Sequence, residues 1–286
     1  MPLIENSGGE QAVVEDPDTD GPKAGVRPDA ALVLEDGSVF WGRGAGAVGV
    51  AIGEICFNTA MSGYQEILTD PSYAGQIVTF TFPHIGNVGT NPEDIETLTP
   101  AARGCVLRAP ITAPSNWRAT QNFSNWLKTH NLVAITHVDT RRLTRRIRDG
   151  GAPRGTLMYS PGETIDVAAL RFMAERWPSL EGTDLAKEVM CRQTYAWEET
   201  RWALGTGYGR LQEPRWHVVA IDYGAKRNIL RCLASAGCRV TVVPGDASVE
   251  DVASIAAALG NALSPRALSD DMHEAILARA LGLSVP

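Results

Sequence analysis

Hydrophobic and polar positions alternate over short distances in the first half of the chain, a pattern typical of a β-rich unit. Apolar runs at residues 31–34 and 39–41 flank Asp36-Gly37, a dipeptide favoured in tight hairpin turns. A β-hairpin is therefore expected there. Segments rich in glycine, proline and asparagine separate three further expected strands, at residues 54–58, 76–82 and 103–107.

The pattern then changes to one in which strands and helices alternate. A short helix at 123–130 and a strand at 132–135 precede a helix that Thr140 can cap and that ends at Gly150-Gly151. A strand is expected at 155–159 and a helix at 166–177. The apolar residues on one side of that last helix are Leu170, Met173, Ala174 and Trp177.

A parallel α/β arrangement is predicted near the end of the chain. The near-continuous apolar run at 218–221 is typical of a strand buried on both faces. A helix at 226–236 and a strand at 239–243 follow, and Ser248 can cap a helix that runs to 259. One more helix is expected, at 270–281, and no third strand is visible. Residues 181–216 are mixed in character and are interpreted as a linker.

Composition narrows the class of protein. The chain has 286 residues and a net charge of -7, which argues against a nucleic-acid surface as its main function. It has no run of eighteen apolar residues, so no membrane span is expected. Residues 1–29 are expected to be a disordered acidic tail, and they lack the basic and apolar regions of a signal peptide. A cytoplasmic protein with neither nucleic-acid nor membrane partners is predicted.

The five cysteines do not point to a disulfide framework, a metal site or a catalytic nucleophile. They are scattered and form no C-x-x-C pair. A hydrolase nucleophile in an α/β protein typically occupies a G-x-[SC]-x-G turn beside a histidine, and none of the five lies in such a turn. From these residues alone no catalytic role is assigned to the chain. The five are Cys56, Cys105, Cys191, Cys232 and Cys238.

A glycine-rich stretch, GAGAVG at 44–49, matches the dinucleotide-binding pattern G-x-G-x-x-G. That function needs the glycines to open a helix whose N-terminus holds a pyrophosphate. The following residues, VAIGEICFN, read as a strand. A glycine-rich connection between strands is therefore favoured over a nucleotide-binding oxidoreductase.

The helix expected from Thr140 carries five arginines between positions 141 and 148. Leu143 and Ile147, four residues apart, are expected to pack inward. A solvated basic helix facing an acidic partner surface is favoured over a phosphate or RNA site, because the chain as a whole is acidic.

A polar stretch between strands, residues 57–91, reads FNTAMSGYQEILTDPSYAGQIVTFTFPHIGNVGTN. Loops with many hydrogen-bonding groups on a β scaffold often form binding surfaces. From the residues alone, a binding loop and ordinary turn chemistry are equally supported.

This stretch closely resembles the small, glutamine-hydrolysing subunit of carbamoyl phosphate synthetase. Segments that match in the same order are LVLEDGSVFWGRG, HNLVAITHVDTRRLTRRIRDGGAPRG, GTDLAKEV and VVAIDYGAKRNILRCLASAGCRVTVVP. The resemblance covers about residues 30–253. It implies an α/β fold in which a β/β/α swivelling-type domain at 30–180 binds the synthetase large subunit. After the linker, residues 217–286 would be the incomplete start of a flavodoxin-like class I glutamine amidotransferase domain.

The resemblance also implies a chemistry. In the family, a cysteine in a G-I-C-L-G-H-Q turn attacks the amide of glutamine and forms a thioester, with a histidine and a glutamate from an H-P-E segment. The released ammonia reaches the large subunit, where ATP and Mg are used to make carbamoyl phosphate for arginine and pyrimidine synthesis. No cofactor is expected in this chain itself.

Only part of that machinery is expected here. The family's glutamine pocket uses a serine that corresponds to Ser72 within Asp70-Pro71-Ser72. The S-N-G-P-G-D-P loop, the cysteine turn and the H-P-E segment are absent, and residues 271–274 receive no role. The chain, truncated or diverged after about residue 253, is expected to lack glutaminase activity and to bind glutamine weakly or not at all. The alternative is a non-catalytic protein that docks on the large subunit.

Overall fold

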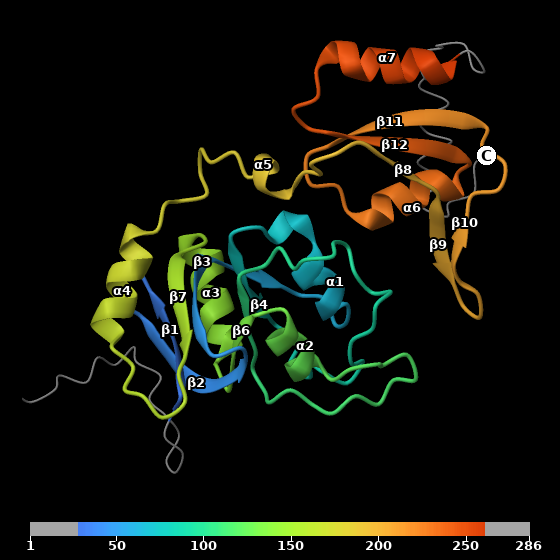
Figure 1. Ribbon diagram of the computed structural model, residues 1–286. Helices are drawn as coiled ribbons and strands as arrows, with labels where there is room; N and C mark the ends of the chain where they lie inside the picture. Colours follow the sequence, from blue (N-terminus) through green and yellow to red (C-terminus); the bar gives the residue numbers. More distant parts are fainter. Residues whose placement is uncertain (1–27, 261–286) are drawn as a thin grey trace, which may run out of the picture.

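The computed structural model describes residues 28–260, which form two bodies (Figure 1). The larger body is a barrel with helices around it, and the smaller one is a three-stranded sheet with its own helices and a hairpin. The chain between the bodies carries the short helix α5 (Ala186–Val189). Residues 1–27 of the tail expected at 1–29, and the helix expected at 270–281, lie outside the described residues.

Seven strands close the barrel in the order β1-β2-β6-β5-β4-β3-β7, because β1 pairs with both β2 and β7. Strands β3, β4, β5 and β6 run parallel, and the other pairs are antiparallel. The strands are β1 (Ala30–Leu34), β2 (Val39–Gly46), β3 (Gly49–Asn58), β4 (Gln76–Phe80), β5 (Gly104–Val106), β6 (Val133–Thr136) and β7 (Arg154–Tyr159). Closure leaves no unpaired edge in the barrel.

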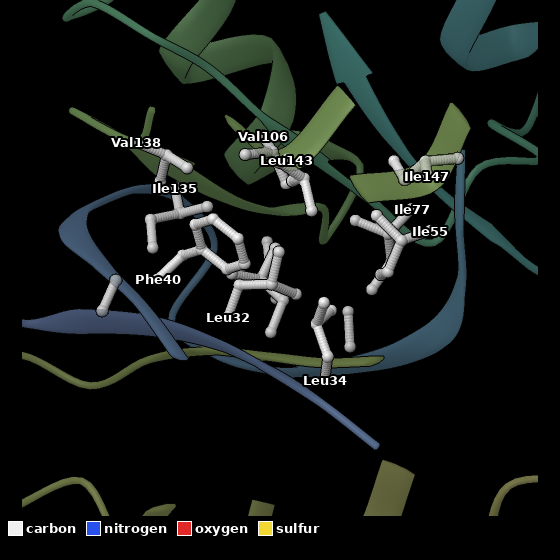
Figure 2. Close-up of a cluster of buried hydrophobic side chains, with 14 residues drawn as sticks. Leu32, Leu34, Phe40, Ile55, Ile77, Val106, Ile135, Val138, Leu143 and Ile147 are labelled. Carbon is white, nitrogen blue, oxygen red and sulfur yellow. The ribbon is translucent and has the colours of Figure 1, made fainter. Parts of the chain in front are cut away.

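The barrel interior is filled by alternate residues of its strands. Leu32 and Leu34 point inward beside Ile55 and Ile77, and Leu143 and Ile147 of helix α3 (Thr140–Gly150) join the same cluster (Figure 2). The intervening β1 residues pack outward against helix α4 (Val167–Arg176). Both faces of β1 are therefore covered, which explains why all five of its residues are buried.

A second apolar cluster covers the barrel on the side of helices α1 (Tyr64–Thr69) and α2 (Phe123–Thr129). Phe123 and Trp126 of α2 stack with their ring centroids 6.0 Å apart, and Tyr64 packs on Phe123 at 4.5 Å. Directly after α1 comes the 3-10 turn η1 (Pro71–Tyr73), which this cluster holds at the edge of the barrel.

The smaller body is a β-α-β unit with an added strand. Strands β11 (Trp216–Asp222) and β12 (Cys238–Pro244) are parallel, and β8 (Tyr195–Trp197) pairs antiparallel with β12. Helices α6 (Arg227–Ser235) and α7 (Val249–Gly260) lie on opposite faces of this sheet (Figure 1). The hairpin of β9 (Glu199–Ala203) and β10 (Gly207–Arg210) packs on α6.

Most of the expected elements are confirmed. The mixed α/β class is correct, Asp36-Gly37 turns the β1–β2 hairpin, and Leu143 and Ile147 are buried. Ser248 caps α7 by accepting a hydrogen bond from the Asp251 backbone at 3.0 Å, as its spacing predicts.

Three expectations need correction. Asp139, not Thr140, caps α3, since its carboxylate accepts hydrogen bonds from two backbone N–H groups of the first turn. Met173 is 36% exposed, whereas Leu170 and Ala174 are the buried residues of α4. Strand β11 is half-buried, since it lies at the edge of its sheet in the described part of the chain.

Residues 181–216, interpreted from the sequence as a linker, contain strands β8, β9 and β10. These strands pack against α6 and β12 rather than crossing open space between the bodies. Part of this range therefore belongs to the smaller body.

Candidate functional site

Ser72, the residue expected to contact glutamine, lies in η1 with an exposed side chain. The turn forms here because Asp70 caps it and Pro71 stands at its first position, a favoured pairing of residue types. The Asp70 carboxylate accepts a hydrogen bond from the Ser72 backbone N–H at 2.9 Å. The position of Ser72 is therefore fixed by its backbone while its hydroxyl stays accessible.

A second turn follows the carboxyl end of β11 and is organised by Asp222. One carboxylate oxygen accepts from the backbone N–H groups of Gly224 and Ala225, each at 2.8 Å, and the other accepts from Cys191 at 2.7 Å. Gly224 has φ +100°, a conformation that favours glycine. The carboxyl ends of parallel strands are where ligands bind in open α/β sheets.

These two turns meet. The Lys226 ammonium lies 2.6 Å from the Asp70 carboxylate, and this hydrogen bond raises the pKa of Lys226. A Cβ added to Gly224 would come 3.3 Å from Cβ of Pro71, so the two turns lie too close for a larger residue at this position without a shift. Glu96 accepts from the Asn228 backbone N–H at 2.9 Å, which places a carboxylate at the first turn of α6.

The β9–β10 hairpin of the smaller body contacts the barrel body at the loop that contains Glu93. Trp202 and Tyr208 both donate to Glu93, the first through its indole N–H to the carboxylate at 3.1 Å and the second through its hydroxyl to the carbonyl at 2.9 Å. The Arg118 guanidinium stacks 4.6 Å from the Trp202 ring and pairs with Glu93 and Asp94 at 3.0 and 2.6 Å. These contacts hold the seam between the bodies.

One carboxyl group near the seam, that of Glu66, has a pKa close to neutral pH. Burial raises the pKa of Glu66 from 4.5 to about 7, and the carboxylates of Asp94 and Glu96 raise it further while Arg118 opposes them. Glu66 therefore titrates near neutral pH.

The described cysteines are poor candidates for a nucleophile. Burial raises the pKa of Cys56 and Cys105 to about 12, and burial with the nearby Asp222 carboxylate raises that of Cys191 to about 11. Burial also raises the pKa of Cys238. A raised pKa keeps the thiol protonated and unreactive at neutral pH. In residues 28–260 the hydrogen bonds of histidine rings go to Trp126, Thr136 and Thr241, none of them a cysteine.

The GAGAVG stretch has no helix after it. Gly44 and Gly46 lie in β2, and Gly49 begins β3. A Cβ on Gly44 would stand 1.7 Å from the Tyr159 ring, so packing inside the barrel accounts for this glycine. The interpretation as a strand connection is confirmed.

A surface hollow of about 540 Å³ lies beside the β9–β10 hairpin, and Ser72 is not among its lining residues. Its charged lining is internally paired, since Arg210 binds Glu198 at 2.7 Å and Arg227 stacks on Trp197.

Across the described residues, no cluster of acidic, histidine and cysteine side chains could hold a metal ion. No helix among residues 28–260 has the length and apolarity needed to cross a bilayer.

Sequence reasoning identified Ser72 but missed Asp70, Asp222 and Lys226, which build the seam. A signal for Asp222 does exist, because an acid that ends an apolar strand two residues before a glycine is typical of a ligand-facing turn in α/β proteins. The pairing of Lys226 with Asp70 joins residues 156 positions apart in sequence, and no local pattern indicates it.

Comparison with known proteins supports the family resemblance found in the sequence. Residues 32–157 match the family described as carbamoyl-phosphate synthase small chain, CPSase domain. The carbamoyl phosphate synthase small chain of Ruegeria pomeroyi is 59% identical over 226 residues, covering 79% of this chain and 58% of that protein. The corresponding protein of Bradyrhizobium diazoefficiens is 54% identical over 230 residues, with the same two coverages.

The match extends from the barrel into the smaller body, since 226 aligned residues exceed the length of the barrel alone. The chain spans about three fifths of the length of the curated relatives it matches. On the family match and these identities, the chain belongs to the carbamoyl-phosphate synthase small chain family.

Proposed function

We propose that this chain acts as the small-subunit component of a glutamine-dependent carbamoyl phosphate synthase. The barrel body at 30–180 is a swivelling-type docking domain for the large subunit, which uses ATP and Mg. The body that contains β11 begins a class I glutamine amidotransferase domain of flavodoxin-like form. Its parallel β11-α6-β12 unit supports this assignment, because such domains start with that arrangement. The pathway setting is cytoplasmic synthesis of arginine or pyrimidines.

The observation that carries the proposal is the contact of two turns, one from each body. Lys226 and Asp70 bring the turn after β11 against η1, so the exposed Ser72 hydroxyl lies on the barrel side of a seam at the carboxyl end of β11. In this proposal Ser72 contributes a hydroxyl to glutamine, and the β11 body provides the other wall. The barrel would then have a second role besides docking.

The chain as written is proposed to be inactive as a glutaminase. Thioester formation needs a thiolate, and a neighbouring base that takes and returns the proton. Two observations support this view: the pKa values of Cys56, Cys105, Cys191 and Cys238 are raised, and in residues 28–260 no histidine ring is hydrogen-bonded to a cysteine. Glutamine binding is proposed to be weak or absent, because the S-N-G-P-G-D-P loop that completes the family's glutamine pocket does not occur in the sequence. The alternative function is a non-catalytic protein that docks on the large subunit.

A glutamine-turnover experiment tests the proposal. The purified chain is mixed with a synthetase large subunit, and carbamoyl phosphate is measured with glutamine or with ammonia as the nitrogen source. We expect product from ammonia alone, and no thioester on the chain by mass spectrometry after an acid quench. A trapped thioester, or product from glutamine, would contradict the absence of a nucleophile.

A further inference from the structure

The outer face of α3 carries a stripe of exposed arginines. Arg141, Arg145 and Arg148 are spaced four and three residues apart, which places them on one side of the helix. They lie opposite Leu143 and Ile147, which are buried in the barrel core. Arg148 pairs with the adjacent Asp149 at 2.8 Å. We call Arg141, Arg145 and Arg148 the arginine stripe.

This arrangement works against the stability of the helix. Like charges at this spacing repel, and Arg141 stands in the first turn, where a cation opposes the helix dipole. Within residues 28–260, neither Arg141 nor Arg145 has a carboxylate within ion-pair distance. An anion placed along the stripe would remove both penalties.

The chain itself supplies such an anion. Residues 1–27 carry six carboxylates and only two cations, Lys23 and Arg27. Four of the six stand close together in the sequence EDPDTD at 15–20. We call residues 15–20 the acidic segment. The rest of the chain offers no comparable run of acids, so this segment is the natural electrostatic match for the stripe.

The point at which this part of the chain enters the barrel lies near the start of α3. Asp29 accepts from the Gly44 backbone N–H at 2.8 Å and lies 3.5 Å from the Arg43 guanidinium. Arg43 is opposite Thr136 in the β2–β6 register, and α3 begins four residues after Thr136. Asp29 is therefore anchored one strand away from the segment that leads into the helix.

The reach is sufficient. Asp20 is nine residues before Asp29, a span of up to about 30 Å in extended chain. The stripe from Arg141 to Arg148 is about 10 Å long on a helix. The acidic segment can thus lie along the whole stripe without displacing Asp29 from Arg43.

We propose that the acidic segment binds the arginine stripe of its own chain. The contact consists of exposed ion pairs that strengthen one another because they share a single tether. The contact would offset the like-charge repulsion along this face of α3. This inference is independent of the glutamine site.

Arginine footprinting tests the contact on the full chain. The wild type and a variant with Glu15→Gln, Asp16→Asn, Asp18→Asn and Asp20→Asn are treated with phenylglyoxal, and modification rates are read by mass spectrometry. We expect Arg141 and Arg145 to react about threefold faster in the variant. The rate at Arg239, exposed on β12, should not change and serves as the internal control.

A charge-matched variant separates this contact from general electrostatics. Glu181→Gln, Asp184→Asn, Glu213→Gln and Asp246→Asn remove four exposed acids elsewhere and should leave the rates at Arg141 and Arg145 unchanged. In about 1 M salt, where the Debye length is ~3 Å, wild type and acidic-segment variant should react alike. Equal rates in these two proteins at low salt would overturn the proposal.

The reciprocal experiment uses the other side of the contact. In the variant Arg141→Gln, Arg145→Gln, trypsin should cleave after Lys23 about threefold faster than in the wild type. Unchanged cleavage contradicts the proposal. If protection from trypsin rises with protein concentration, the arginine stripe binds a second copy of the chain. If protection is lost on nuclease treatment, the stripe binds nucleic acid. Either result overturns an intramolecular contact.

Discussion

The Nζ atom of Lys226 lies 2.6 Å from a carboxylate oxygen of Asp70, and this one contact joins the two bodies of the protein beside Ser72. Asp70 is 8% exposed and its other oxygen accepts from the Ser72 backbone N–H at 2.9 Å. A single carboxylate therefore shapes η1 and holds it against the turn after β11.

Replacing Lys226 with methionine should weaken the seam. The variant keeps the length of the side chain but leaves the largely buried Asp70 carboxylate without its cation, at a cost of about 1–2 kcal/mol. Urea unfolding should show this loss, and hydrogen exchange should rise at Gly224 and Ala225. The control is Lys187→Met, because the Lys187–Asp184 pair is mostly exposed and should contribute almost nothing.

The same pair predicts a pH dependence at the alkaline end. The hydrogen bond from Lys226 to Asp70 raises the folded-state pKa of Lys226 above its ordinary value near 10.4. Its contribution to stability is therefore complete below about pH 10 and is lost as the pH rises through the raised pKa. The stability difference between wild type and Lys226→Met should shrink over that range, and a difference that stays constant would contradict the assignment.

Glu66 should destabilise the fold at neutral and alkaline pH. Burial raises its folded-state pKa to about 7, so the folded protein binds more protons than the unfolded chain between about pH 4.5 and 7, and stability falls as the pH rises through that window. Glu66→Gln should stabilise the protein by about 2 kcal/mol at pH 8 and by almost nothing at pH 4. Denaturant titrations at the two pH values measure the difference. An equal effect at both would exclude the titration of Glu66 as its cause.

Gly44→Ala should destabilise the barrel, because Gly44 is required for packing and not for binding a nucleotide. Its Cβ would overlap the Tyr159 ring, and overpacking of this kind costs about 1–3 kcal/mol or more. Thermal unfolding measures the loss. Gly150→Ala, at a position with open space around it, is the matched control and should be near neutral. A stable Gly44→Ala protein would contradict the packing account of this glycine.

Local patterns predicted the barrel's elements better than their arrangement. The Asp36-Gly37 turn and the spacing of Leu143 and Ile147 carry their structural meaning within a few residues. Closure of the barrel needs β1 to pair with β7, more than 100 residues later, and β8 joins β12 across a shorter step of about 45 residues. Such pairings are decided by packing, which no short window of sequence encodes.

The candidate site, too, combines features that local sequence predicts with contacts that it does not predict. Ser72 was predicted from the resemblance of this chain to one family, and the Asp-Pro pair ahead of it explains the turn locally. The residues that join the two bodies lie at the start of α6, in the β9–β10 hairpin and in the 93–96 loop, and their contacts exist only in the folded chain. The cap of α3 was misassigned because Asp139 and Thr140 are adjacent and both residue types favour that position.

Limited proteolysis should cut residues 217–286 before residues 30–180. The smaller body has a modest apolar cluster, and in its described part β11 presents an unpaired edge, whereas the barrel is closed. Mass spectrometry of early tryptic fragments should show a barrel core with its C-terminal part removed. A C-terminal part that resists trypsin longer than the barrel would contradict this ranking of local stability.

Association with a synthetase large subunit tests the central claim most directly. The full chain is sedimented with the large subunit of the carbamoyl phosphate synthase from Ruegeria pomeroyi, whose small chain is 59% identical to it over 226 residues. The account predicts a complex of micromolar affinity or tighter, whether or not glutamine is present. Independent sedimentation of the two proteins at every soluble concentration would contradict the docking role.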